Sequence, residues 1–115
     1  MGMLPDQALD LWHRSVVRSV RSDSPDFSAR QMAVLLTVYL TPQPHTVHGL
    51  AVELNISKSA ITRALDRLGE FGLVRRKPDE TDRRSIEVQQ MVKGSVFLSE
   101  FPEIVIRLSG ETFGR

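Results

Sequence analysis

One stretch of the sequence decides the fold: residues 56–85, ISKSAITRALDRLGEFGLVRRKPDETDRRS. Ser57 has the residue type and the position of a helix N-cap, and the residues after it place apolar side chains on one helical face and polar side chains on the other. Gly72 supplies the left-handed conformation at which helices commonly end. The pattern predicts an amphipathic helix over residues 58–71, followed by an extended segment.

The segment before this helix has a helical pattern of its own. Leu50, Ala51 and Leu54 have helical spacing, and Asn55 is a turn residue that tolerates unusual backbone angles. Two helices joined in this way form a helix-turn-helix, whose second helix enters the major groove of DNA and meets base edges with its N-terminal residues. The candidate DNA-binding residues of that helix are Ser57, Lys58, Ser59, Thr62, Arg63 and Arg67.

A β-hairpin over residues 75–88 follows the helix. The alternation of Ile86 and Val88 indicates a returning strand, and Pro78 ends the outgoing one. Long guanidinium side chains at a hairpin tip can enter a minor groove, where A·T-rich sequence concentrates negative potential. The candidate DNA-binding residues here are Arg75 and Arg76 on the strand and Arg83 and Arg84 at the tip, although Arg75 and Arg76 also suit a solvated edge strand.

Two carboxylates in this stretch would repel DNA phosphates unless they have another role. We expect Asp82 to hold an arginine in place by a charge-assisted hydrogen bond. We expect Asp66 to brace Arg63 or Arg67 on the same helix rather than to read a cytosine. Both carboxylates are therefore predicted to be structural braces of the helix and the hairpin.

The runs TVHGLAVELNISKSAITRALDRL and TRALDRLGEFGLVRRKPDETDRRSIEV resemble the MarR family of winged helix-turn-helix regulators, over residues 28–94. The family's Asp-x-Arg wing motif is here Asp82-Arg83-Arg84. The resemblance, which is to a short member of the family, implies a dimeric winged helix with its recognition helix at residues 58–71. It also implies that Arg84 is the minor-groove residue.

Composition bounds the class of protein. The 115 residues suit one domain, and 15 Lys and Arg against 14 Asp and Glu give a net charge of only +1. Residues 56–84, however, hold eight of these basic residues and five acidic ones, so that stretch has a net charge of +3. A local positive field is what binding to double-stranded DNA requires, because phosphate contacts supply most non-specific affinity.

The sequence lacks the features of several classes of protein and of several kinds of site. The chain has no cysteine, so disulfides and thiolate zinc sites are excluded, and His45 and His48 have no partner that would complete a metal site. No apolar run suits a membrane span and no secretory signal is visible, so we expect a cytoplasmic protein. Without a nucleophile motif or a Gly-rich phosphate loop, we expect neither an enzyme nor a cofactor.

Residues 4–22 predict an amphipathic first helix, whose apolar stripe is Leu9, Trp12, Val16 and Val20. The spacing from Ser28 to Gln31 is that of a capping box, which predicts the start of a second helix. The family resemblance implies an effector pocket between the first helix, the second helix and the DNA-binding lobe. Trp12 and His13 are candidate residues of such a pocket for a small-molecule effector, with packing as the alternative role.

The C-terminal part departs from the family pattern Val-x-Leu-Thr-x-x-Gly. Gln90 and Met91 stand at the leucine and threonine positions, so the next helix lacks a threonine N-cap and should start differently, and Gln90 needs a polar partner. The apolar residues that follow exceed what a small winged helix can cover. We therefore expect residues 4–22 and 95–113 to be dimerisation helices.

Together these patterns predict a mainly α single domain over residues 1–115: a winged helix-turn-helix core with a small β-hairpin wing, and N- and C-terminal helices that form a dimerisation region. The expected function is that of a sequence-specific transcriptional regulator, a homodimeric repressor on a pseudo-palindromic operator. The alternative is a winged-helix protein-docking module without specific DNA binding. Such a module would not need a basic wing tip.

Overall fold

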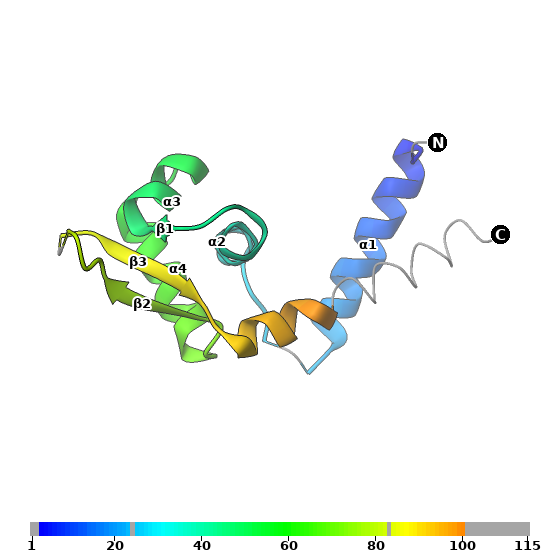
Figure 1. The fold of residues 1–115 in the computed structure, drawn as a ribbon. Coiled ribbons are helices and arrows are strands. Elements are labelled where there is room, and N and C mark those ends of the chain that lie inside the picture. Colours follow the sequence, from blue (N-terminus) through cyan, green and yellow to red (C-terminus); the bar gives the residue numbers. More distant parts are fainter. Residues whose placement is uncertain (1–2, 24, 83, 101–115) are drawn as a thin grey trace. The chain divides into compact units, whose positions relative to one another are not determined.

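A computed structural model describes residues 3–23, 25–82 and 84–100 of the chain (Figure 1). Two compact units divide the chain: a terminal unit, Met1–Asp26 with Leu98–Arg115, and a winged unit, Phe27–Phe97. The described part of the terminal unit is built on α1 (Pro5–Arg21). Within the ranges described, none of the helices combines the length and the hydrophobicity that crossing a bilayer needs.

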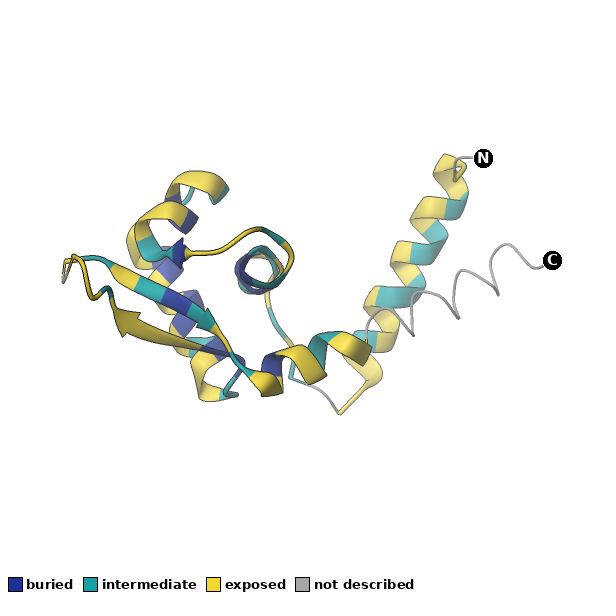
Figure 2. Ribbon diagram, viewed as in Figure 1, coloured by how far each residue is buried: buried dark blue, intermediate teal, exposed yellow. Residues whose placement is uncertain are grey.

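Helix α1 confirms the amphipathic helix predicted for the N-terminal segment. Pro5 occupies its first turn, where a missing N–H costs nothing, and the N–H of Leu4 donates to Oε1 of Gln7 at 3.0 Å. The apolar stripe stays uncovered among the described residues: Leu9, Trp12, Val16 and Val20 are between 46% and 68% exposed. Figure 2 accordingly shows no buried position on α1.

The winged unit contains α2 (Ala29–Leu40), β1 (His45–Thr46), α3 (Val47–Leu54), α4 (Lys58–Glu70), β2 (Val74–Pro78) and β3 (Ile86–Gln90). Residues 92–100 then form a further helical segment. The three strands make an antiparallel sheet in the order β1-β3-β2, so that β2 is an edge strand. The predicted mainly α fold with a small hairpin wing is confirmed.

The helices of the winged unit begin and end where local chemistry predicts. The Ser28 hydroxyl accepts the Gln31 N–H at 3.2 Å, and the Gln31 side chain accepts the Ser28 N–H at 2.9 Å, which confirms the capping box of α2. Asn55 closes α3 with a φ of 53°, and Gly72 follows α4 with a φ of 69°. The helix predicted over residues 58–71 is thus confirmed as α4, which ends one residue earlier, at Glu70, with Phe71 as its C-cap.

The core of the winged unit lies between α2, α3, α4 and the sheet. Helix α2 packs against α3 and α4, and α4 packs against β2. In Figure 2 the buried positions lie on the sides of these helices that face one another. The fully buried large side chains are Val34, Leu35, Val38, Leu50, Ile61, Leu65, Leu68 and Val88.

A tyrosine hydroxyl joins three separate segments of the winged unit. The Tyr39 hydroxyl on α2 donates to the carbonyl of Leu73 at 2.5 Å, just before β2, and accepts the N–H of Met91 at 2.9 Å, just after β3. The Met91 N–H therefore has a partner, and the first turn of the next helical segment is closed by the backbone, since the Gly94 N–H donates to the Met91 carbonyl at 3.0 Å. Nearby, the Gln90 amide donates to the Val38 carbonyl at 3.0 Å, which confirms that Gln90 finds a polar partner.

Gly94 makes this close approach possible. A Cβ at position 94 would lie 1.9 Å from the Tyr39 hydroxyl oxygen and 2.5 Å from the Leu73 carbonyl oxygen. Neither distance can be accommodated, and one of the two atoms belongs to the backbone. The helical segment 92–100 can therefore start at this place only because residue 94 has no side chain.

Gly94→Ala should accordingly destabilise the winged unit by about 1 to 3 kcal/mol, the usual cost of overpacking. Urea unfolding followed by circular dichroism measures the change. The matched control is Gly69→Ala, because a Cβ there lies no closer than 3.9 Å to its nearest neighbour and α4 gains about 0.5–1 kcal/mol of helix propensity. Wild-type stability of Gly94→Ala would show that the contact with Tyr39 does not constrain the fold.

Candidate nucleic-acid interface

Helix α4 exposes the residues predicted to read DNA along one outer face. Its inner face is buried, and Ser57, Lys58, Ser59, Thr62 and Arg63 are all exposed. The Ser57 hydroxyl accepts the Ala60 N–H at 3.0 Å, so its oxygen acts as the helix cap and its hydrogen stays available as a donor. The structure thus brings these candidates together at the N-terminal half of one helix.

Asp66 braces a different arginine from the one expected. Its Oδ1 accepts Nη2 of Arg76 on β2 at 2.5 Å, rather than pairing with Arg63 or Arg67 on its own helix. The reason is tertiary: β2 packs on α4 and brings Arg76 beside it. Because the two side chains are 55% and 36% exposed, the pair contributes at most about 1 kcal/mol to stability. Its consequence is positional, since it links the outer face of α4 to the hairpin.

Arg67 lies in a different environment from the other candidates on α4. Its guanidinium lies 4.7 Å from the Phe71 ring centroid and 5.8 Å from that of Phe27, and it contacts Glu70 at 3.5 Å. The two phenyl rings meet edge to face at 5.6 Å. The cation is therefore engaged with the protein itself at the C-terminal end of α4. This engagement leaves Arg67 less available to DNA than the exposed residues at the start of the helix.

On the hairpin, Arg75 is tied to the sheet as well. Its Nε donates to Oε1 of Gln89, its partner in the β2–β3 register, at 2.7 Å. Four of the five β2 residues are exposed, as expected of an edge strand. Arg75 and Arg76 thus both have protein partners, and each guanidinium has further N–H groups with which to meet a phosphate. Edge protection and phosphate contact remain compatible roles for this strand.

The wing tip is closed by carboxylates that accept main-chain N–H groups. Oδ1 of Asp82 accepts the N–H of Arg84 at 3.0 Å, and the Asp82 carbonyl accepts the Ser85 N–H at 2.9 Å. The bond that the structure describes for the Asp82 side chain is therefore to the backbone of Arg84, and the bond to a guanidinium stays a prediction. An aspartate reaches the N–H two residues ahead without a long side chain. Arg84 is exposed, and Arg83 lies outside the described residues.

Asp79 stabilises the other side of the tip. Its Oδ1 accepts both the Thr81 N–H at 2.9 Å and the Thr81 hydroxyl at 2.8 Å. The backbone N–H of Thr81 is the largest cause that lowers the pKa of this carboxyl below its ordinary value of 3.8, and the Thr81 hydroxyl adds to the effect. Both bonds favour the charged form and hold the turn that presents Arg84.

Arg30 joins the surface although the sequence pattern did not single it out. A cavity of about 170 Å³ lies where α2 begins beside α4, lined by Ser28, Arg30, Gln31, Ala60, Arg63 and Ala64. In the sequence Arg30 is an ordinary polar residue of a first helical turn. Its position beside Arg63 arises because α2 packs on α4, and no local pattern carries that information.

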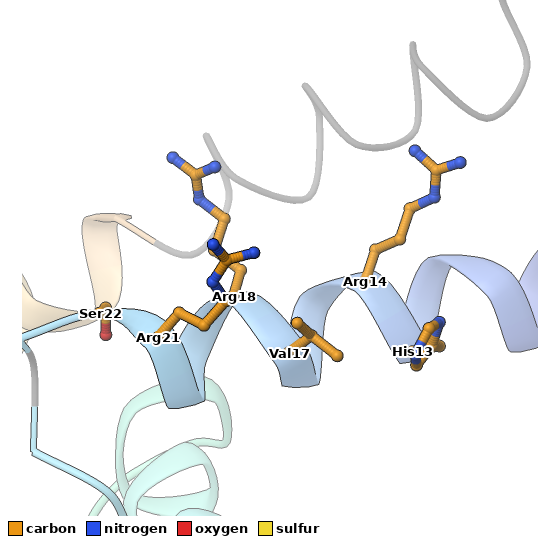
Figure 3. A pocket seen from close by; sticks show the side chains of 6 residues that line it. All are labelled: His13, Arg14, Val17, Arg18, Arg21 and Ser22. Atoms are coloured by element: carbon orange, nitrogen blue, oxygen red, sulfur yellow. The ribbon is translucent and has the colours of Figure 1, made fainter.

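The two residues predicted for an effector pocket are only partly found together. A cavity of about 560 Å³ in the terminal unit is lined, among the described residues, by His13, Arg14, Val17, Arg18, Arg21 and Ser22 (Figure 3). His13 is among them, whereas Trp12 is not and is 68% exposed. The cavity wall is rich in cationic side chains. Among the described residues no cluster of side chains suits a metal ion, and His45 instead contacts Thr41 through Nε2.

We compared the chain with known protein families and with known proteins. The model of the MarR family matches residues 27–86. The HTH-type transcriptional regulator PecS of Dickeya dadantii (strain 3937) is 33% identical over 78 residues, which are 66% of this chain and 47% of PecS. The match thus spans about half the length of that relative.

Solved structures show the same fold. A mutant MarR from E. coli, complexed with operator DNA, matches with a TM-score of 0.67 and 25% identity over 93% of this chain and 71% of that one. The YusO protein from Bacillus subtilis matches with a TM-score of 0.72 over 95% of this chain and 72% of its own. Its identity is 18%, so this second likeness concerns the fold alone.

The pKa of Asp79 gives a test of the wing tip. Because this pKa is lowered in the folded chain, the two bonds to Thr81 contribute fully above pH 3.8 and are lost as the pH falls through the lowered value. The chemical shift of the Thr81 amide should therefore stay constant from neutral pH downwards and change with a midpoint below 3.8. Asp79→Asn should abolish this transition, and a midpoint at or above 3.8 would contradict the bonding described.

Proposed function

The chain belongs to the MarR family, and on that premise we propose that it is a transcriptional regulator that binds double-stranded operator DNA. The observation that carries the proposal is the continuous surface formed by α4 and the hairpin. Exposed polar and basic residues line the N-terminal half of α4, and the Arg76–Asp66 pair links that helix to a hairpin whose tip exposes Arg84.

The two elements of this surface, a helix and a hairpin, suit the two grooves of DNA. An α-helix fits the major groove, and the N-terminal residues of a recognition helix are those that meet base edges. Lys58, Ser59 and Thr62 are the residues we assign to that role, with a hydrogen-bond donor from Ser57. A basic hairpin tip fits the adjacent minor groove, where a narrow width strengthens the attraction for arginine.

The relatives support the same assignment. PecS is a transcriptional regulator of the helix-turn-helix type, and the E. coli MarR structure contains operator DNA. A protein-docking module would bind with little dependence on salt, whereas a surface of phosphate contacts binds more weakly as salt rises. We further propose that the protein represses transcription by occupying the promoter. Because such a protein must reach the chromosome, we also propose that it is cytoplasmic.

A homodimer is the second part of the proposal. The apolar stripe of α1 is exposed at Leu9, Trp12, Val16 and Val20, and covering such a surface is favourable at about 25 cal/mol per Å². We propose that residues 4–22 and 95–113 pair about a two-fold axis; residues 101–113 lie outside the described residues. A two-fold dimer would present two copies of α4 about 34 Å apart, which fits a pseudo-palindromic site.

For a small-molecule effector we propose a chemical class. Among the described residues, the cavity on α1 is lined by His13 and three arginines, of which Arg14 is paired with Asp10 at 3.0 Å. The remaining cations, Arg18 and Arg21, suit an acidic small molecule rather than a cation. Its volume of about 560 Å³ lies within the range of small-molecule sites, about 300–1,000 Å³.

The DNA surface is tested by selecting bound sequences from a random pool at two salt concentrations and measuring affinity for the selected site. Arg84→Ala should weaken binding about tenfold, equivalent to about 1.4 kcal/mol, because it removes the minor-groove cation. Lys93→Ala removes the same charge from the helical segment after β3 and should bind as the wild type does. A pool that yields no enrichment, with affinity insensitive to salt, would refute DNA binding.

The dimer is tested by sedimentation at micromolar concentration. Leu9→Glu places a charge on the exposed stripe of α1 and should shift the protein toward the monomer, because the charge would have to be buried in the interface. The control is Val52→Glu on α3, a similarly exposed apolar position outside the stripe (67% against 62% for Leu9), which should remain dimeric. A wild-type protein that sediments as a monomer would remove the dimer from the proposal.

A further inference from the structure

The cavity between α2 and α4 has an unusual lining for its size. Two arginines from different helices line it, Arg30 in the first turn of α2 and Arg63 on α4. The rest of its described lining is Ser28, Gln31, Ala60 and Ala64. Helices α2 and α4 belong to the same compact unit and pack directly against each other (Figure 1). The juxtaposition is therefore fixed by the core.

Neither guanidinium is engaged with the described part of the protein. Within the described residues, the side chains of Arg30 and Arg63 have no hydrogen bond or ion pair, whereas those of Arg67, Arg75 and Arg76 all have partners. The described lining contains no carboxylate. Two like charges that line one small cavity without a counter-charge repel each other, so an anion between them is favoured.

The size of the cavity limits what the anion can be. At about 170 Å³ it is smaller than the sites that hold drug-sized ligands, about 300–1,000 Å³, yet it has room for several waters at about 30 Å³ each. A tetrahedral oxyanion fits this space. Guanidinium groups bind phosphate oxygens in pairs of parallel hydrogen bonds, and the Ser28 hydroxyl, whose oxygen caps α2, still has a hydrogen to donate.

We propose that this cavity is a phosphodiester site, in which Arg30 and Arg63 together hold one phosphate of the DNA backbone at the edge of the major groove that α4 occupies. The proposal rests on the DNA-binding function proposed above and adds Arg30 to its contacts. It also changes the role of Arg63, which the sequence pattern predicted to read a base.

The position of Arg63 on α4 supports this change. At about 100° per residue, Arg63 lies between the outer face of the helix and the flank that carries Ala60 and Arg67. That flank turns toward α2, since Ala60 and Ala64 line the cavity and Arg67 lies over the Phe27 ring. Ser59 and Thr62 lie farther from it and keep the base-reading role.

Phosphate and base contacts have different experimental signatures. Loss of a phosphate contact weakens binding to all sequences alike and lowers the slope of log affinity against log salt by about 0.9 for each phosphate. Arg30→Ala and Arg63→Ala should each weaken binding about tenfold for specific and random DNA, with the slope reduced by about two in a two-fold dimer. Lys93→Ala is the charge-matched control, and Arg30→Lys should retain most of the slope.

A double variant tests whether the two arginines share one phosphate. If they do, Arg30→Ala combined with Arg63→Ala should lose much less than the product of the two single losses, because the second substitution removes a contact already broken. Replacing single phosphates along the operator by neutral methylphosphonates should locate that phosphate. The wild type should be weakened at that position in each half-site, and Arg30→Ala should be insensitive there.

Three results would overturn the site. Relaxed preference at one base pair in Arg63→Ala would make Arg63 a base reader, and multiplicative losses would separate the two arginines. Unchanged DNA affinity in Arg30→Ala, together with binding of inorganic phosphate to the wild-type protein and not to this variant, would make the cavity a site for a free phosphate. Wild-type DNA binding is measured first, so a failure of the proposed function is distinguished from a failure of this site.

Discussion

The Tyr39 hydroxyl and the side-chain-free position at Gly94 are the constraint on which the rest of the winged unit depends. One oxygen bonds the residue that leads into β2 and the residue that leaves β3, and it is carried by α2. Helix α2 therefore holds both ends of the hairpin at once. Since α2 also packs against α4, this junction helps to fix the position of α4 relative to the wing, together with the direct packing of α4 on β2.

The distribution of carboxylates explains how a chain with a net charge of +1 can present a basic surface. The acidic residues near the surface are engaged with the protein: Asp66 with Arg76, Glu70 with Arg67, and Asp79 and Asp82 with the backbone of the wing tip. Each neutralises an arginine or closes a turn. Among the described arginines of the winged unit, those without a side-chain partner are Arg30, Arg63 and Arg84, and these are the ones assigned to DNA.

The same engagement divides the basic residues into two groups with different roles. Arg67 and Arg76 are fixed by aromatic and carboxylate contacts and hold the C-terminal half of α4 to its neighbours. Arg30 and Arg63 instead converge on a cavity that contains no counter-charge among its described lining residues. A proposed binding surface of this kind combines positioning contacts, which orient the helix, with cations that remain available to the phosphate backbone.

The sequence by itself determined the features that depend on near neighbours in the chain. The caps at Ser28 and Ser57, the left-handed residues Asn55 and Gly72, and the amphipathic face of α4 involve residues within a few positions of one another, so the pattern contained all the information needed. The family resemblance extended this to the winged fold.

Only the tertiary structure decided which charges meet. Asp66 was expected to pair within its helix. Because β2 packs on α4, Asp66 instead pairs with Arg76, which is ten positions further along the chain. Arg30 was not singled out, because its neighbour Arg63 lies on another helix and the packing of two apolar faces brings them together. A long charged side chain pairs with the partner that lies nearest in space, and the packing of the core determines which partner that is.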